Sequence, residues 1–282
     1  MTALADTLLP LGTALGAIAL SAVVLHLLER VTTDAMQAGF GRASVMIFTA
    51  WLGTPVHELS HAILCPVFGH KIVEIRLFKL STEDGTLGYV KHIPSRSWLW
   101  SRLGNFFIGV APLVGGSLVL YAAMAGLFPE SKVTLDGDLG GTASQLGALA
   151  TTAFDWRLAV FAYVVLCVGG HMAPSGADLR GALPGFFLAL GIVLAVFGVA
   201  AATGHGPGLA EAASAGLGPL AAVLLLAVAL NAAMHVLVAA TAVLVQRVQG
   251  RTLAPLFMHH AWRYLLIVGG LVVLGGGVKL LR

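Results

Sequence analysis

Charged residues are scarce in this chain, and that scarcity excludes a soluble globular protein. Asp, Glu, Lys and Arg make up only 10% of the 282 residues, against about 25% in ordinary soluble domains, whereas 58% are hydrophobic. The apolar residues extend along nearly the whole length and give a mean hydropathy of +0.91, which is typical of a polytopic membrane protein. The net charge of +3 is too small to indicate nucleic-acid binding.

Cysteine is also rare. The two cysteines, Cys65 and Cys167, lie in apolar segments and make no spaced pattern. The sequence therefore indicates neither a disulfide framework nor a cysteine-rich zinc site. We expect Cys65 to be a small buried apolar side chain.

The apolar residues form segments long enough to cross a membrane. A helix needs roughly 20 mostly apolar residues to span about 30 Å of hydrocarbon. The candidates are 8–28, 43–68, 104–128, 156–173, 182–203, 217–246 and 262–281. We predict an all-α polytopic membrane protein with six or seven transmembrane helices, organised as a single transmembrane domain over 1–282. The fourth segment is short and runs into a Gly- and Pro-containing stretch, which predicts a helix broken within the membrane.

The distribution of lysine and arginine predicts the orientation. With a cytoplasmic N-terminus and seven alternating crossings, ten of the sixteen basic residues lie inside and six lie outside. Because cytoplasmic loops carry an excess of Lys and Arg, the count favours a cytoplasmic N-terminus and an external C-terminus. We expect an integral protein of a bacterial-type inner (cytoplasmic) membrane.

One segment between the apolar runs, residues 70–93, has a pattern of its own. Val73, Ile75 and Leu77 alternate with charged residues, 83–85 supplies turn chemistry, and a second β-prone stretch follows. This pattern predicts a membrane-associated β-hairpin on the cytoplasmic side. The alternative is an amphipathic loop that covers lipid headgroups.

The strongest signal is the pentapeptide from His57 to His61 within the second apolar segment. On a helix these histidines lie one turn apart on the same face and can bind one zinc ion, with Glu58 beside them as a general base. Ionisable groups within a membrane helix are costly and are usually retained for function. The alternatives are a hydrogen-bonded helix-packing cluster and coincidence.

A catalytic zinc site usually has three protein ligands, and Asp178 is the candidate for the third. It lies at the disrupted point between the fourth and fifth segments and is the single carboxylate between Asp155 and Glu211. Irregular backbone at membrane depth is tolerated where it lines protein or a wet cavity, which suits a metal ligand. Alternatively, Asp178 caps the following helix or pairs with Arg180.

These motifs resemble the site-2 proteases, which are intramembrane zinc metalloproteases, over residues 43–185. The resemblance implies that His57, His61 and Asp178 bind Zn²⁺, that Glu58 is catalytic, and that a membrane-associated hairpin follows the HExxH helix. Residues 186–282 are then additional C-terminal spans.

The chain departs from that family in three places and is similar to a divergent member. His171 stands where the family has asparagine, Asp178 begins Asp-Leu-Arg-Gly rather than lying in Leu-Asp-Gly, and 111–115 only partly matches Gly-Pro-x-x-Asn. His171 is either a hydrogen-bond donor to substrate or metal-bound water, or a buried histidine bonded to a carbonyl. Asn231 and His235 either extend a polar path to the zinc or make interhelical hydrogen bonds.

The sequence therefore predicts an intramembrane zinc endopeptidase that hydrolyses peptide bonds of membrane-embedded substrates. We expect the substrate, a transmembrane segment within the lipid bilayer, to unwind and add as a strand to the 70–93 hairpin, with selection by the chain itself or by an accessory regulator. The alternative is a non-proteolytic zinc-binding transporter or scaffold. A transporter is disfavoured because one broken region has no counterpart in a second half of the chain.

Overall fold

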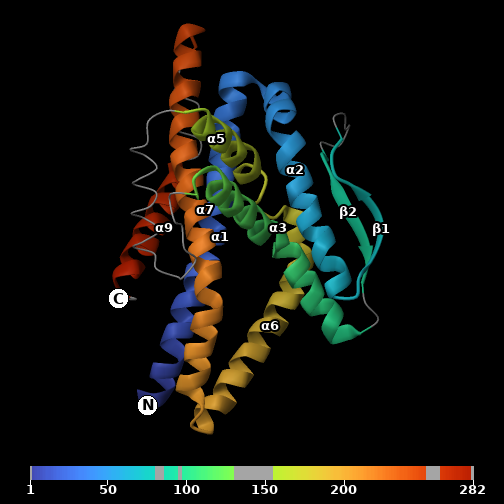
Figure 1. Ribbon diagram of the computed structural model, residues 1–282, viewed down its shortest axis with the longest axis vertical. Coiled ribbons are helices and arrows are strands. Elements are labelled where there is room, and N and C mark those ends of the chain that lie inside the picture. The colour runs from blue at the N-terminus through green and yellow to red at the C-terminus, as the bar shows by residue number, and fades with distance from the viewer. Residues whose placement is uncertain (1, 80–85, 95–96, 130–154, 252–260, 281–282) are drawn as a thin grey trace.

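The computed structural model describes residues 2–79, 86–94, 97–129, 155–251 and 261–280. The described chain is mostly helical, with one small antiparallel sheet (Figure 1). In chain order the elements are α1 (Thr2–Phe40), α2 (Arg42–Val67), β1 (Lys71–Arg76), β2 (Tyr89–Ile93), α3 (Trp98–Leu127), α5 (Trp156–Gly169), α6 (Gly176–Ala202), α7 (Gly206–Val248) and α9 (Ala261–Leu280).

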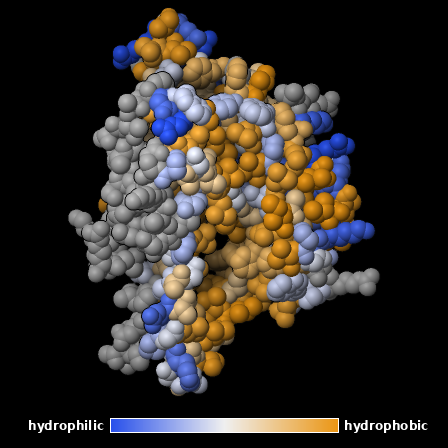
Figure 2. All heavy atoms as spheres, in the orientation of Figure 1, coloured by the Kyte–Doolittle hydropathy of each residue, from blue (hydrophilic) through white to orange (hydrophobic). Residues whose placement is uncertain are grey.

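Four of the described helices are long and apolar enough to cross a membrane. They are Leu11–Phe40, Trp98–Leu127, Gly176–Ala202 and Gly206–Val248. Large apolar residues cover much of the described part of the face that Figure 2 shows. Since soluble proteins bury such surface, the chain is an integral membrane protein.

α1 is longer than the sequence predicted. The candidate span 8–28 ends before Glu29 and Arg30, whereas the helix continues past both residues. Their polar groups have partners within the protein: Arg30 Nε donates to His26 Nε2 at 3.3 Å, and Glu29 accepts a backbone N–H. The helix therefore continues to Phe40 and turns at Gly41, whose φ of 82° suits glycine.

α2 packs antiparallel to α3 and parallel to α5. Ser60 contacts Gly115, and Phe68 further along α2 contacts Gly104 earlier in α3. Towards α5 the order is the same in both helices: the Tyr163 hydroxyl donates to the Phe48 carbonyl at 2.6 Å, whereas later residues of α2 contact residues near 171. These contacts surround the middle of α2 with main-chain groups from both neighbours.

α6 runs in the same direction as α5, because it packs antiparallel to α3. Gly109 of α3 contacts Ala182, and Arg102 at the start of α3 contacts Gly185 further along α6. The alternating directions expected for the fourth and fifth apolar segments were therefore wrong. The bend at 170–175 interrupts the helix without reversing the chain, as Figure 1 shows.

The C-terminal helices pack on α1. α7 is parallel to α1, since Thr32 Oγ1 lies 3.1 Å from His235 Nδ1 and the Ala38 carbonyl accepts from Gln246 Nε2 at 3.4 Å. α9 is antiparallel to α1, since Arg263 near its start donates to Asp34 at 2.8 Å and Gly270 further along contacts Val24. The main apolar core lies among α1, α3, α5 and α7.

The predicted hairpin is confirmed as two antiparallel strands directly after α2. The register pairs Lys71 with Ile93 and Arg76 with Tyr89, with an irregularity near Ile72. The expected turn residues 83–85 lie outside the described residues. The sheet follows α2 back along its length, so that the residues just before β2 lie beside the middle of that helix (Figure 1).

Candidate metal centre

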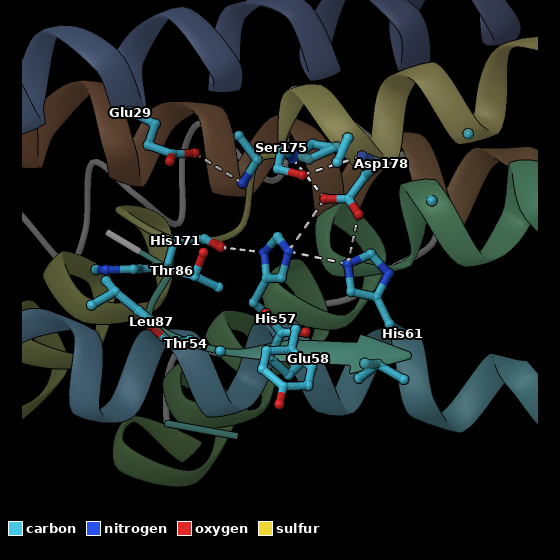
Figure 3. Close-up of a pocket in the computed structure, with 18 of the residues that line it drawn as sticks. Glu29, Thr54, His57, Glu58, His61, Thr86, Leu87, His171, Ser175 and Asp178 are labelled. Carbon is cyan, nitrogen blue, oxygen red and sulfur yellow. Dashed lines mark hydrogen bonds and ion pairs between the residues drawn. The ribbon is translucent and has the colours of Figure 1, made fainter. Parts of the chain in front are cut away.

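His57 and His61 project from one face of α2, as their spacing predicted. Their Nε2 atoms are 3.1 Å apart, and both side chains are largely buried. Figure 3 shows both rings facing the same point, where Asp178 enters from α6. The geometry is that of a metal-binding pair one helical turn apart.

Neighbouring backbone fixes which nitrogen of each ring faces that point. His57 Nδ1 lies 2.7 Å from the His171 carbonyl oxygen, and His61 Nδ1 lies 2.7 Å from the Ile108 carbonyl oxygen. A carbonyl oxygen can only accept, so each Nδ1 carries the proton and donates it. The Nε2 atom of each neutral ring is left with a lone pair directed at its neighbour.

Asp178 completes the group. Its Oδ2 lies 3.6 Å from His57 Nε2 and its Oδ1 lies 3.4 Å from His61 Nε2. It also belongs to a capping box at the start of α6, where the Ser175 side chain accepts from the Asp178 amide and Asp178 Oδ2 accepts from the Ser175 amide. The two interpretations of Asp178, ligand or cap, are therefore compatible, because one cap contact holds the carboxylate against the imidazoles.

The three residues lie close enough to hold a metal ion, with their ligand atoms within 4.8 Å of one another. Around a tetrahedral zinc, ligand atoms at about 2.0–2.1 Å from the ion lie roughly 3.3 Å apart. The two Nε2 atoms, 3.1 Å apart, are close to that spacing, and each lies 3.4–3.6 Å from a different oxygen of the Asp178 carboxylate. Two imidazole nitrogens and one carboxylate are a donor set that zinc takes in proteins, so the group fits zinc chemically.

A cavity of about 860 Å³ opens over this group. Glu58 lines it with its side chain largely buried, next to Thr54 one turn earlier on α2. The residues before β2 form another wall, and Gly88 lies so close that an added Cβ would be 2.9 Å from Glu58 Cγ. The cavity therefore places a carboxylate, three potential ligands and a strand in one space.

The backbone and the ring of His171 have different roles. Its carbonyl orients His57, whereas its Nδ1 lies 2.9 Å from the Cys167 carbonyl oxygen at the end of α5. The ring also packs directly against Gly53. The contact between His171 and the metal ligands is therefore made by the main chain, and a role of its imidazole towards substrate stays a prediction.

The polar residues of α7 that were considered for the site make interhelical contacts. Asn231 Nδ2 donates within α7 to the Ala227 carbonyl at 2.8 Å, and its side chain contacts Met172 Sδ at 3.9 Å and packs on Gly169 at the end of α5. His235 contacts Thr32 of α1. Of the two interpretations, interhelical packing is the one that fits these contacts. Cys65 is fully buried among apolar side chains, as expected.

Glu29 is a residue of the cavity that the sequence interpretation missed. Its Oε2 accepts from the Ala173 amide at 3.0 Å, on the bend between α5 and α6 (Figure 3). The available signal was a carboxylate next to an apolar segment. That signal is weak, because nothing local distinguishes a residue that ends a membrane helix from one that faces a distant loop.

This chain matches no protein-family model, no curated protein and no solved structure. Its function is therefore inferred from the site itself.

Proposed function

We propose that the chain is an intramembrane zinc endopeptidase, as the resemblance of its motifs to the site-2 proteases implies. The single observation that carries the proposal is the convergence of two oriented Nε2 atoms and the Asp178 carboxylate beside Glu58. Two imidazoles and one carboxylate with an open fourth position are typical of catalytic zinc rather than structural zinc.

The residues present can divide the work of hydrolysis. When bound, zinc supplies a Lewis acid that activates water and polarises a carbonyl. Glu58 takes a proton from the attacking water and returns it to the departing amine, for which its place in the same cavity is suitable. Donation of the Nδ1 protons to main-chain carbonyls orients His57 and His61, so that Nε2 of each ring faces the ion.

The substrate is a membrane-embedded segment that adds as a strand to β2. A helical substrate hides its scissile carbonyls in its own hydrogen bonds, so it must unwind, and the main-chain groups it loses need partners in the membrane. In the described part of the chain β2 pairs with β1 alone, and residues 86–90 line the cavity beside Glu58. The other edge of β2 offers the required donors and acceptors.

We further propose six crossings, with the N-terminus in the cytoplasm of a bacterial-type cell. α5, the bend and α6 form one interrupted crossing, and α2 and α9 cross although they are not among the four longest apolar helices. The irregular backbone at 170–175 then lies beside the metal ligands and the cavity. This suits a membrane crossing, since such backbone is tolerated only against protein or a wet cavity.

Two measurements test the proposal together. Purified full-length protein should carry about one zinc ion per chain, and Glu58→Gln should keep that zinc while losing cleavage by a factor of at least about 100. Proteomics of membrane fragments from cells carrying the native chain or the variant would then identify the substrate. Absence of zinc, or unchanged fragments with Glu58→Gln, would exclude a zinc peptidase with this base.

A further inference from the structure

We infer that Glu29 of α1 is a positioning residue of the metal centre, which acts through the Ala173 amide. The inference rests on the proposed zinc site and extends it to a helix that supplies no ligand. Glu29 lies outside the HExxH motif, and its carboxylate reaches the bend between α5 and α6 at 3.0 Å. That bend carries both the carbonyl that orients His57 and the start of the helix that supplies Asp178.

The bend exposes main-chain groups that a continuous helix would pair internally. Unpaired groups are costly at membrane depth, so their partners determine where the bend lies. Three of these groups have partners at the site, and two of the partners are carboxylates. The Ala173 amide donates to Glu29, the Ser175 amide donates to Asp178, and the His171 carbonyl accepts from His57.

The three hydrogen bonds to the bend come from three different elements. The contact of Asp178 is made within its own capping box, and that of His57 comes from α2. Glu29 is the one of these partners that α1 supplies, and Ala173 itself is almost fully buried. The Glu29 contact therefore fixes the bend relative to α1, two residues from the carbonyl that orients His57.

Helix packing alone does not require a carboxylate at position 29. A carboxylate within an apolar helix is costly unless it is paired, whereas leucine would fill the same space at no such cost. The same helix face carries His26 and Thr33, which also line the cavity. Glu29 thus lies on the polar face that α1 presents to the metal centre. Its carboxylate oxygen accepts the hydrogen bond from the Ala173 amide of the bend.

The test compares two substitutions of similar size in the full-length protein. Glu29→Gln keeps a side-chain oxygen that accepts from the Ala173 amide, whereas Glu29→Met does not. We expect Met to weaken zinc binding about 10- to 100-fold, as loss of a supporting contact usually does, and Gln to stay near the native affinity. Thr33→Val, on the same cavity wall, is the matched control and should bind zinc as the native chain does.

Zinc affinity is measured by competition with a chromophoric chelator, and the Co²⁺ spectrum reports ligand geometry. A folded Glu29→Met that binds zinc as tightly as Glu29→Gln would overturn the inference. If Glu29→Met does not fold, hydrogen exchange in the native chain decides, because an unprotected Ala173 amide also contradicts it. Failure of the native chain to bind zinc would instead count against the proposed function and leave the Ala173 measurement interpretable.

Discussion

At the scale of single residues, the site depends on hydrogen bonds that decide which atom of each ligand faces the metal. His57 and His61 would be ordinary polar residues if their Nδ1 protons were not donated to backbone carbonyls. Asp178 likewise gains its direction from the capping box at the start of α6. The ligand set is therefore assembled by main-chain groups of three elements, and the imidazoles and carboxylate are oriented before any ion binds.

Asp178 and Ser175 can be separated experimentally, because they share a cap but only one is a ligand. Ser175→Ala removes the hydroxyl that accepts from the Asp178 amide and should cost about 1 kcal/mol of folding stability while zinc stays bound. Asp178→Ala should lose most zinc affinity. The measurement is zinc stoichiometry with thermal unfolding of both variants. Full zinc occupancy in Asp178→Ala would show that another group is the third ligand.

The residues also show what sequence alone can predict. His57, Glu58 and His61 were found because a helix turns the spacing of four residues directly into a shared face. Asp178 followed from its place at the broken helix. Glu29 was missed, since its partner is a backbone amide 144 residues away that no local pattern announces.

At the scale of elements, the hairpin is held by polar contacts across its strands. The Tyr89 hydroxyl donates to Glu74 Oε1 at 2.5 Å, and Lys91 Nζ donates to Glu74 Oε2 at 3.1 Å. Lys91 also lies over the Tyr89 ring, 4.6 Å from its centre. These contacts lower the pKa of Glu74 below its ordinary value of 4.5, chiefly through the tyrosine hydroxyl.

The lowered pKa predicts an acid-sensitive hairpin. Because the folded carboxyl has the lower pKa, its contribution to stability is complete above pH 4.5 and is lost as the pH falls through the folded value. Hydrogen exchange of the β1 and β2 amides, corrected for intrinsic rates, should therefore accelerate on acidification. Glu74→Gln is the control that removes this titration while metal loss at low pH persists. An identical acid response in both proteins would contradict the prediction.

Gly88 tests whether the approach of the hairpin to α2 matters for catalysis. An added Cβ would lie 2.7 Å from Thr54 Cγ2 and 2.9 Å from Glu58 Cγ, so the strand or the carboxylate must move. We expect Gly88→Ala to lower cleavage roughly 10- to 100-fold with zinc retained, since small misplacements of a catalytic group are costly. Gly181→Ala, on the same cavity with no atom within 4 Å of the added Cβ, should cleave normally. Equal cleavage rates for Gly88→Ala and Gly181→Ala would show that the approach of the hairpin to α2 does not affect catalysis.

At the scale of the whole molecule, the direction of each helix was the hardest feature to predict. All seven apolar segments contain helices, and the hairpin follows the expected helix. Hydropathy marks where a helix lies but not which way it runs. The stretch after Gly169 was predicted to break a helix within the membrane, yet the segments on either side were counted as two alternating crossings. The contacts of Gly109 and Gly185 between α3 and α6 instead require that the chain continues in one direction.

These directions change the charge count for the two sides of the membrane. Basic residues on the side of the N-terminus, by chain order, are Lys71, Arg76, Lys79, Lys91, Arg96, Arg102, Lys279 and Arg282. Those on the other side are Arg42, Lys132, Arg157, Arg247, Arg251 and Arg263. The remaining two of the sixteen, Arg30 and Arg180, lie inside the proposed crossings, in α1 and just after the bend between α5 and α6, and are not counted. For the six crossings proposed above, eight against six agrees with a cytoplasmic N-terminus and puts the C-terminus on the same side.

Cysteine labelling tests this topology at two turns. Thr203→Cys, at the end of α6, should react with a membrane-impermeant maleimide only after permeabilisation, whereas Gln249→Cys, at the end of α7, should react in intact cells. Both positions are exposed, and the native Cys65 and Cys167 are buried, so background labelling should be low. The opposite pattern is what seven alternating crossings from a cytoplasmic N-terminus require. It would mean that α6 returns across the membrane and that the chain after the bend reverses in the bilayer, against the packing of α6 on α3.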